Sequence, residues 1–150
     1  MDNAITEQQI IDVLASKHTR DLFVPHCKTG PSWYSKPMIL DAWVMPFSWT
    51  KPIRGYEIKV SKSDFRRDRK WIGYLEYCNL FYFVCPWGVI PPGLVPDEAG
   101  LIYVTKTGTG IRYIKPAPSH WWHMIPQGIF QYVLMWRKQE LQLIDKTEER

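Results

Sequence analysis

Cysteine is scarce in this chain, and its spacing argues against the common cysteine-based structures. The three cysteines, Cys27, Cys78 and Cys85, are an odd number and form no CxxC pair. Neither a disulfide framework nor a paired-cysteine zinc site is therefore expected. Reduced thiols in a cytosolic protein fit this usage best, and Cys78 and Cys85, which flank an apolar segment, are expected to be inert core thiols.

Long apolar runs and targeting signals are missing as well. No stretch approaches the roughly 18 residues of a membrane span. The N-terminus, MDNAITEQQ, is polar and acidic, unlike a signal peptide. The turn TGTG (107–110) lacks the GK[ST] of a phosphate-binding loop, and no internal repeat is visible. We therefore expect a cytoplasmic protein with no membrane partner.

What the chain does have is enough apolar material for one core. Its 150 residues are 45% apolar and 23% charged, as in an ordinary globular domain. The net charge of +4 favours an anionic partner without requiring one. Eight tryptophans supply core packing or stacking surfaces. We find no internal linker, so residues 1–150 are expected to form a single domain.

Hydrophobic periodicity predicts an α/β domain with a mixed central sheet. The expected helices are 6–17, 64–78 and 128–143, and the expected strands are 22–28, 38–45, 53–60, 79–85, 101–105 and 111–114. Segments 38–45 and 53–60 are joined by a short connector and should form a hairpin. Segment 79–85 is almost entirely apolar, which is typical of a strand buried on both faces.

Glu57 and Lys59 lie two residues apart in the predicted strand 53–60, so their side chains point to the same face. Asp41 lies in the middle of the neighbouring apolar segment MILDAWVM (38–45), with fifteen residues between it and Glu57. If the two strands pair, Asp41 comes close to Glu57. The sequence therefore predicts two carboxylates and one ammonium on a single patch of the sheet.

Two carboxylates this close repel each other unless a cation lies between them, and oxygen ligands suit Mg²⁺ or Mn²⁺. The main-chain carbonyl of Ile58 is a natural additional ligand. Such a cation polarises a phosphate and acidifies a water, while Lys59 orients that water or offsets transition-state charge. The pattern favours metal-assisted hydrolysis of a phosphodiester. The alternative is an ordinary surface ion pair between Glu57 and Lys59.

A basic run, RRDRK (66–70), follows this strand directly. Arg66, Arg69 and Lys70 fall near one face of the predicted helix, and Lys70 and Tyr74 are one turn apart. Because a DNA backbone must pass beside such a metal site, phosphate contact is the predicted role of these cations. The alternative is a solvated helix face. Trp71 is expected to pack in the core rather than to stack on a base.

The arrangement of Asp41 and Glu57-Ile58-Lys59 resembles the acid and ExK elements of the PD-(D/E)XK nuclease superfamily. The segment from Tyr56 to Val104 is similar to the MmcB-like DNA repair proteins of bacteria. It carries an EIKVS strand, a DF..D.KW..Y helix, an FYF strand and an LVP...GLI segment.

This resemblance implies a restriction-endonuclease-like single domain that cleaves DNA with Mg²⁺ or Mn²⁺ or has a related DNA repair role. It implies that Asp41, Glu57 and Lys59 form the catalytic site and that Glu7 is the helix acid that some members add to the metal ligands. Read without the resemblance, Glu7 is either that acid or a first-turn carboxylate that favours the helix dipole.

Two properties of the superfamily leave alternatives open. Inactive members exist, so a nucleic-acid-binding module of the same fold without catalysis is the second hypothesis. Many nucleases of this fold dimerise to cut both strands, so a homodimer is compatible with the resemblance, while the sequence itself does not give the oligomeric state. The resemblance also places the protein inside a bacterial cell, encoded by the bacterium or by a phage.

Two further patterns in the sequence relate to other functions. His120 and His123 form an HxxH pair that could join His26 or Cys27 in a zinc site. Without a CxxC or HExxH pattern, loop packing is the favoured interpretation. The tryptophan-rich segments 87–96 and 119–126 would serve as a contact surface if the protein were an interaction domain, which is the third hypothesis.

Overall fold

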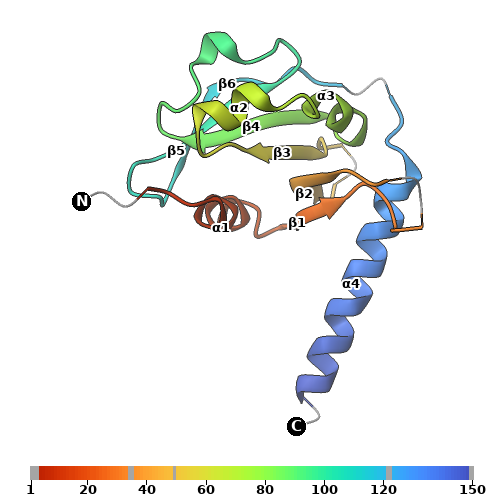
Figure 1. Cartoon of the computed structure of the whole chain (residues 1–150). Coiled ribbons are helices and arrows are strands. Elements are labelled where there is room, and N and C mark those ends of the chain that lie inside the picture. Colours follow the sequence, from red (N-terminus) through yellow and green to blue (C-terminus); the bar gives the residue numbers. More distant parts are fainter. Residues whose placement is uncertain (1–3, 34–35, 49, 121–122, 149–150) are drawn as a thin grey trace.

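A six-stranded mixed sheet runs through the computed structural model, which describes residues 4–33, 36–48, 50–120 and 123–148 (Figure 1). The strands lie side by side in chain order: β1 (Asp21–Lys28), β2 (Ile39–Pro46), β3 (Arg54–Ile58), β4 (Leu80–Pro86), β5 (Gly100–Val104) and β6 (Ile111–Lys115). The pairs β3–β4 and β4–β5 are parallel, and the other three are antiparallel. The predicted hairpin and the mixed sheet are therefore confirmed.

Helices cover both faces of the sheet. On one side lies α1 (Glu7–Lys17), and on the other lie α2 (Lys62–Arg67) and α3 (Trp71–Tyr74), which is followed by a 3₁₀ turn, η1 (Leu75–Tyr77) (Figure 1). A second 3₁₀ turn, η2 (Pro92–Leu94), precedes β5. The arrangement is that of a single α/β domain consistent with the restriction-endonuclease-like fold, as the sequence predicted.

Two apolar clusters hold these layers together. Ile10, Ile11 and Leu14 of α1 pack against one face of the sheet, including Tyr56 and Ile58. The other cluster lies on the opposite face, and its large buried side chains include Leu40, Trp43, Phe81, Phe83 and Leu101. The N-terminus of α1 is fixed by Thr6 and Gln9, which form a reciprocal capping box.

The last helix, α4 (Gln127–Glu148), is longer than the predicted 128–143. Ile129 and Val133 near its start are buried, whereas its second half extends away from the sheet (Figure 1). None of the helices within the described ranges is both long enough and apolar enough to cross a membrane.

The prediction of one continuous helix over 64–78 is wrong. The chain leaves the helical conformation at Asp68, whose backbone is extended (φ −72°, ψ 119°), and α3 begins only at Trp71. The side chain of Asp68 explains the break, because its Oδ1 accepts a hydrogen bond from the Lys70 N–H at 2.8 Å. An aspartate that binds nearby backbone competes with the helix for that donor. The consequence is a kinked connection directly above the end of β3.

Candidate functional site

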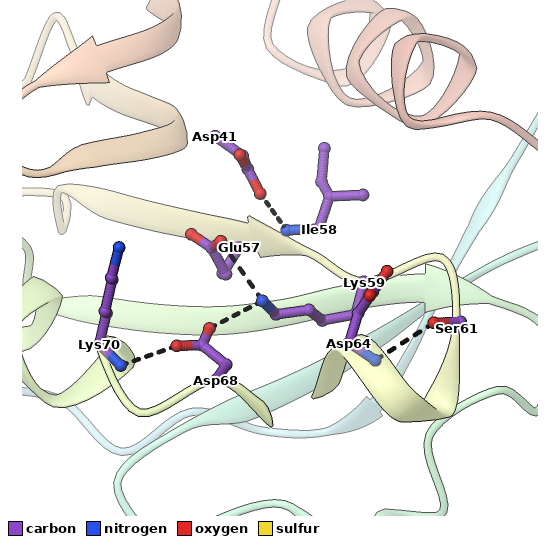
Figure 2. A network of polar contacts seen from close by, with 8 residues as sticks. All are labelled: Asp41, Glu57, Ile58, Lys59, Ser61, Asp64, Asp68 and Lys70. Carbon is purple, nitrogen blue, oxygen red and sulfur yellow. Dashed lines mark hydrogen bonds and ion pairs between the residues drawn. The ribbon is translucent and has the colours of Figure 1, made fainter. Parts of the chain in front are cut away.

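The site begins where β2 and β3 separate. The two strands pair from Val44–Arg54 to Ala42–Tyr56. Beyond the last pair, the Oδ2 of Asp41 on β2 accepts a hydrogen bond from the N–H of Ile58 on β3 at 2.7 Å (Figure 2). A side-chain acceptor thus replaces a main-chain one at this point. The interaction fixes the Asp41 carboxylate between β2 and β3, just beyond the last paired residues of the two strands.

Glu57 lies at the end of β3, close to Asp41. The residue is buried, and its Oε2 finds no hydrogen-bond donor among the described residues. Burial and then the charge of Asp41 raise the pKa of the Glu57 carboxyl well above its usual value, although Lys59 opposes the shift. Burial also raises the pKa of Asp41, against the effect of the Ile58 hydrogen bond. A proton held on Glu57 would be a donor toward Asp41, so the pair resists carrying two negative charges.

Lys59 follows Ile58 just beyond the end of β3, and its ammonium lies between the carboxylates of Glu57 and Asp68 (Figure 2). Its Nζ lies 2.8 Å from Oδ2 of Asp68 and 3.7 Å from Oε1 of Glu57. Burial alone would lower the pKa of Lys59, but its hydrogen bond to Asp68 and the charge of Glu57 raise the pKa overall. Lys59 therefore keeps its proton near neutral pH and provides a fixed positive charge.

These groups line a cleft of about 510 Å³. Five carboxylates contribute to its walls: Glu7, Asp41, Glu57, Asp64 and Asp68. Four cationic side chains also line it: Lys59, Arg67, Arg69 and Lys70. Among these residues Glu57 is buried. The exposed ones at the edge of the cleft include Asp64, Arg67, Arg69 and Lys70. The cleft thus has an acidic interior and a basic rim.

Most of the residues predicted for the site meet in this cleft. Ile58 and Tyr74 line it together with Glu7, Asp41, Glu57, Lys59, Arg69 and Lys70. Arg66 is exposed and is not among the lining residues, while Arg67 is. The prediction that Arg66 shares a face with Arg69 and Lys70 assumed one continuous helix. Because the helix breaks at Asp68, Arg69 and Lys70 do not continue the helical faces of α2. Trp71 packs against Phe83 in the core, as expected (ring centroids 6.2 Å apart).

Glu7 is exposed in the first turn of α1 and faces Asp41. Burial, although partial, and the charge of Asp41 raise the pKa of Glu7. The structure adds His26, for which the sequence suggests only a zinc site with the distant HxxH pair. Glu7, His26 and Asp41 each offer a ligand atom, and these three atoms lie within 4.8 Å of one another.

Two residues that sequence reasoning missed, His26 and Asp68, approach the site from segments outside the hairpin. Asp68 carried a weak signal, since it is a single acid within a basic run. His26 carried none, because a lone histidine in a strand has many uses.

A cation suits this donor set. The interior offers carboxylate oxygens, one of which is buried and unpaired, and hard divalent cations bind such oxygens. The proposed zinc alternative fits less well. The Nε2 atoms of His120 and His123 lie near main-chain oxygens of Glu98 and Glu76, at 3.2 Å and 3.1 Å. Within the described ranges, neither belongs to a cluster of three metal-binding side chains. Trp121 and Trp122, between these histidines, lie outside the described residues.

Comparison with known proteins identifies the family. The profile of the MmcB-like DNA repair proteins matches residues 41–127, which is more than half of the chain and begins at Asp41. No curated protein matches the sequence. The SPO1766 protein of unknown function from Silicibacter pomeroyi has a similar solved structure, with a TM-score of 0.70 and 20% identity over 99% of this chain and 97% of that one. At that identity the likeness shows a shared fold. The chain belongs to the MmcB-like DNA repair protein family.

Proposed function

We propose that this protein is a Mg²⁺- or Mn²⁺-dependent nuclease that hydrolyses phosphodiester bonds of DNA during repair. One observation carries the proposal. The buried, unpaired carboxylate oxygen of Glu57 lies beside Asp41 and within reach of a protonated Lys59. A protein does not usually keep a buried carboxylate beside a half-buried one unless a cation or a proton compensates them. Family membership supports the DNA repair context.

The residues inside the cleft have two roles in this proposal, cation binding and charge compensation. Asp41 and Glu57, with the Ile58 carbonyl and Glu7, would hold the cation. The cation supplies positive charge to the phosphate and makes a nearby water more acidic. Lys59 keeps its proton, so it acts as a charge that offsets the developing negative charge on the phosphate and positions the water, and not as a general base.

The rim would guide the substrate. Arg67, Arg69 and Lys70 line the cleft just outside the carboxylates, where their charges can meet successive phosphates. Tyr74 is buried in the wall, and burial followed by the nearby negative charges raises its pKa, so its hydroxyl stays neutral. It is a hydrogen-bond donor available to a phosphate oxygen. DNA is the proposed substrate because the chain belongs to a family of DNA repair proteins, and phosphate contacts of this kind require no particular base sequence.

The test is a cleavage assay on linear, nicked, branched and single-stranded DNA with Mn²⁺ or Mg²⁺. The parent should cut at least one substrate, and Glu57→Ala and Lys59→Ala should each lose that activity. Arg66→Ala is a matched control, because Arg66 lies in the same basic run but does not line the cleft. If Glu57→Ala and Lys59→Ala cut as well as the parent, the mechanism is wrong.

A second candidate is a non-catalytic module that binds nucleic acid. One observation favours it: Lys59 lies closer to Asp68 than to Glu57, as a lysine with a structural role would. Such a module needs no metal. Calorimetry with Mn²⁺ separates the two candidates, because the nuclease should bind at least one ion and lose that binding in Asp41→Asn.

A further inference from the structure

We propose that His26 is a nitrogen ligand of the divalent cation and that it makes the site prefer Mn²⁺ over Mg²⁺. The inference rests on the proposed cation site and adds to it a donor that lies outside the family match at 41–127. It concerns which cation the protein selects.

The fold brings His26 to Asp41 through a break in the β1–β2 ladder. Pro25 pairs with Ala42 and Cys27 pairs with Leu40, so His26 and Asp41 fall between two regular pairs. His26 has a positive φ of 47°, the only described non-glycine residue with a positive φ. This local irregularity takes the imidazole out of the regular strand pattern. His26 on β1 and Asp41 on β2 consequently occupy neighbouring positions on adjacent strands.

The distances suit a shared cation. The three ligand atoms from Glu7, His26 and Asp41 lie within 4.8 Å of one another. Around an octahedral ion with bonds of about 2.1 Å, ligand atoms are about 3 Å apart when adjacent and about 4.2 Å when opposite. A bound cation would have to draw the exposed Glu7 and His26 side chains inward to close the remaining gap. None of the hydrogen bonds or ion pairs of the described residues engages His26, so no structural contact competes for its nitrogens.

A second observation concerns the carboxylate that adjoins this group through Asp41. Glu57 is only 8% exposed, and its Oε2 has no hydrogen-bond partner among the described residues. Its charge interacts with that of Asp41, which also belongs to the His26 group. Asp41 thus links the buried unpaired carboxylate to the exposed histidine. A cation at Asp41 would compensate Glu57 while taking a donor from His26.

The chemistry of imidazole then decides the preference. Mg²⁺ favours oxygen ligands and keeps much of its water shell. Mn²⁺ also binds carboxylate oxygens, but as a first-row transition ion it accepts an imidazole nitrogen more readily than Mg²⁺ does. A site made only of carboxylates would discriminate little between Mg²⁺ and Mn²⁺. Replacing one oxygen with the His26 nitrogen favours the transition ion.

The test uses the full-length protein loaded with Mn²⁺ alone, studied by pulsed electron paramagnetic resonance. A directly bound imidazole adds a ¹⁴N modulation to the Mn²⁺ signal, and this readout needs no DNA and no turnover. The parent should show the modulation, and His26→Asn should lose it. Asparagine is chosen because it tolerates a positive φ better than most residues. His123→Asn is the matched control and should keep the modulation.

A second variant tests the preference itself. His26→Asp restores a ligand and tolerates the backbone, but offers oxygen in place of nitrogen. It should bind Mn²⁺ without ¹⁴N modulation, and the ratio of Mg²⁺ to Mn²⁺ dissociation constants should fall by about tenfold. Circular dichroism checks that each variant folds.

The outcomes separate this inference from the proposed function. Mn²⁺ binding without ¹⁴N modulation in the parent, or modulation that persists in His26→Asn, overturns the role of His26 even if DNA is cut. Failure of the parent to bind Mn²⁺ overturns it too. A ¹⁴N modulation that depends on His26 supports the inference even if no DNA substrate is cleaved, in which case only the nuclease proposal fails.

Discussion

The ammonium of Lys59 lies 2.8 Å from the carboxylate of Asp68, and both side chains are almost fully buried. The contact joins the end of β3 to the break between α2 and α3. Because Asp68 also accepts the Lys70 N–H, one carboxylate fixes both the catalytic lysine candidate and the start of the basic rim (Figure 2). The helix break is therefore part of the site and not a defect beside it.

Asp68→Asn should destabilise the protein and misplace Lys59. Removing one charge of a buried pair leaves the other poorly compensated, although Glu57 remains nearby, so we expect a loss of about 1–3 kcal/mol in the free energy of unfolding. Urea denaturation measures this loss. Asp64→Asn is the control, because Asp64 lines the same cleft, is exposed and makes no ion pair with a described residue. Equal stability of the two variants would show that the Lys59–Asp68 contact contributes nothing.

Glu57→Gln should stabilise the metal-free protein at neutral pH. Burial and the charge of Asp41 raise the pKa of Glu57 in the folded state above its unfolded value. Between these two values the folded state binds more protons than the unfolded state, so the stability of the parent falls as pH rises. Below the unfolded value the two states bind the proton equally and the effect vanishes.

The measurement is thermal or urea unfolding in the presence of a chelator. At about pH 8 the Gln variant should be more stable than the parent by about 1–3 kcal/mol, and at about pH 4 the difference should be close to zero. Adding Mn²⁺ should stabilise the parent more than the variant. A stability difference that does not change with pH would mean that folding does not raise the pKa of Glu57.

Removing a rim cation should weaken DNA binding and reduce its salt dependence. Each phosphate contact that is lost lowers the slope of log K against log salt by about 0.9 for duplex DNA. We expect this change for Arg69→Ala and Lys70→Ala, measured by fluorescence anisotropy in a Glu57→Ala background that cannot cleave. Arg66→Ala should leave the slope nearly unchanged, because Arg66 does not line the cleft. The same slope in all three variants would place the DNA elsewhere.

The three cysteines should be unreactive in the folded protein. All are buried, and burial raises the pKa of Cys27 and Cys78 to about 12 and that of Cys85 to about 11. Because the thiolate is the reactive form, a thiol reagent at neutral pH should modify them only after denaturation. Rapid modification of the native protein would show that one of them is accessible through local opening.

The parts of the site that follow local patterns were predictable from the sequence. Alternation along β3 placed Glu57 and Lys59 on one face, and the acid within an apolar strand singled out Asp41. Both inferences depend only on the two-residue period of a strand and on the cost of a buried charge. The fold class followed from the order of the predicted helices and strands, which hydrophobic periodicity supplies.

The remaining features depend on contacts between distant segments. Helical periodicity continued through Asp68 because the residues on both sides favour a helix, and only its contacts with Lys59 and Lys70 interrupt it. The prediction of a continuous helix therefore also placed Arg66 in the site, whereas Arg66 does not line the cleft. His26 became part of the site through a ladder irregularity between β1 and β2, which no local pattern encodes.

The hydrogen bond between Asp41 and Ile58 limits the denticity of the site. One carboxylate oxygen of Asp41 already accepts the hydrogen bond that links β2 to β3, so Asp41 is suited to give a cation one oxygen and not two. The remaining coordination positions must then come from other groups and from water. A cation held this way keeps positions open for exchange, which a hydrolytic site needs and a purely structural site does not.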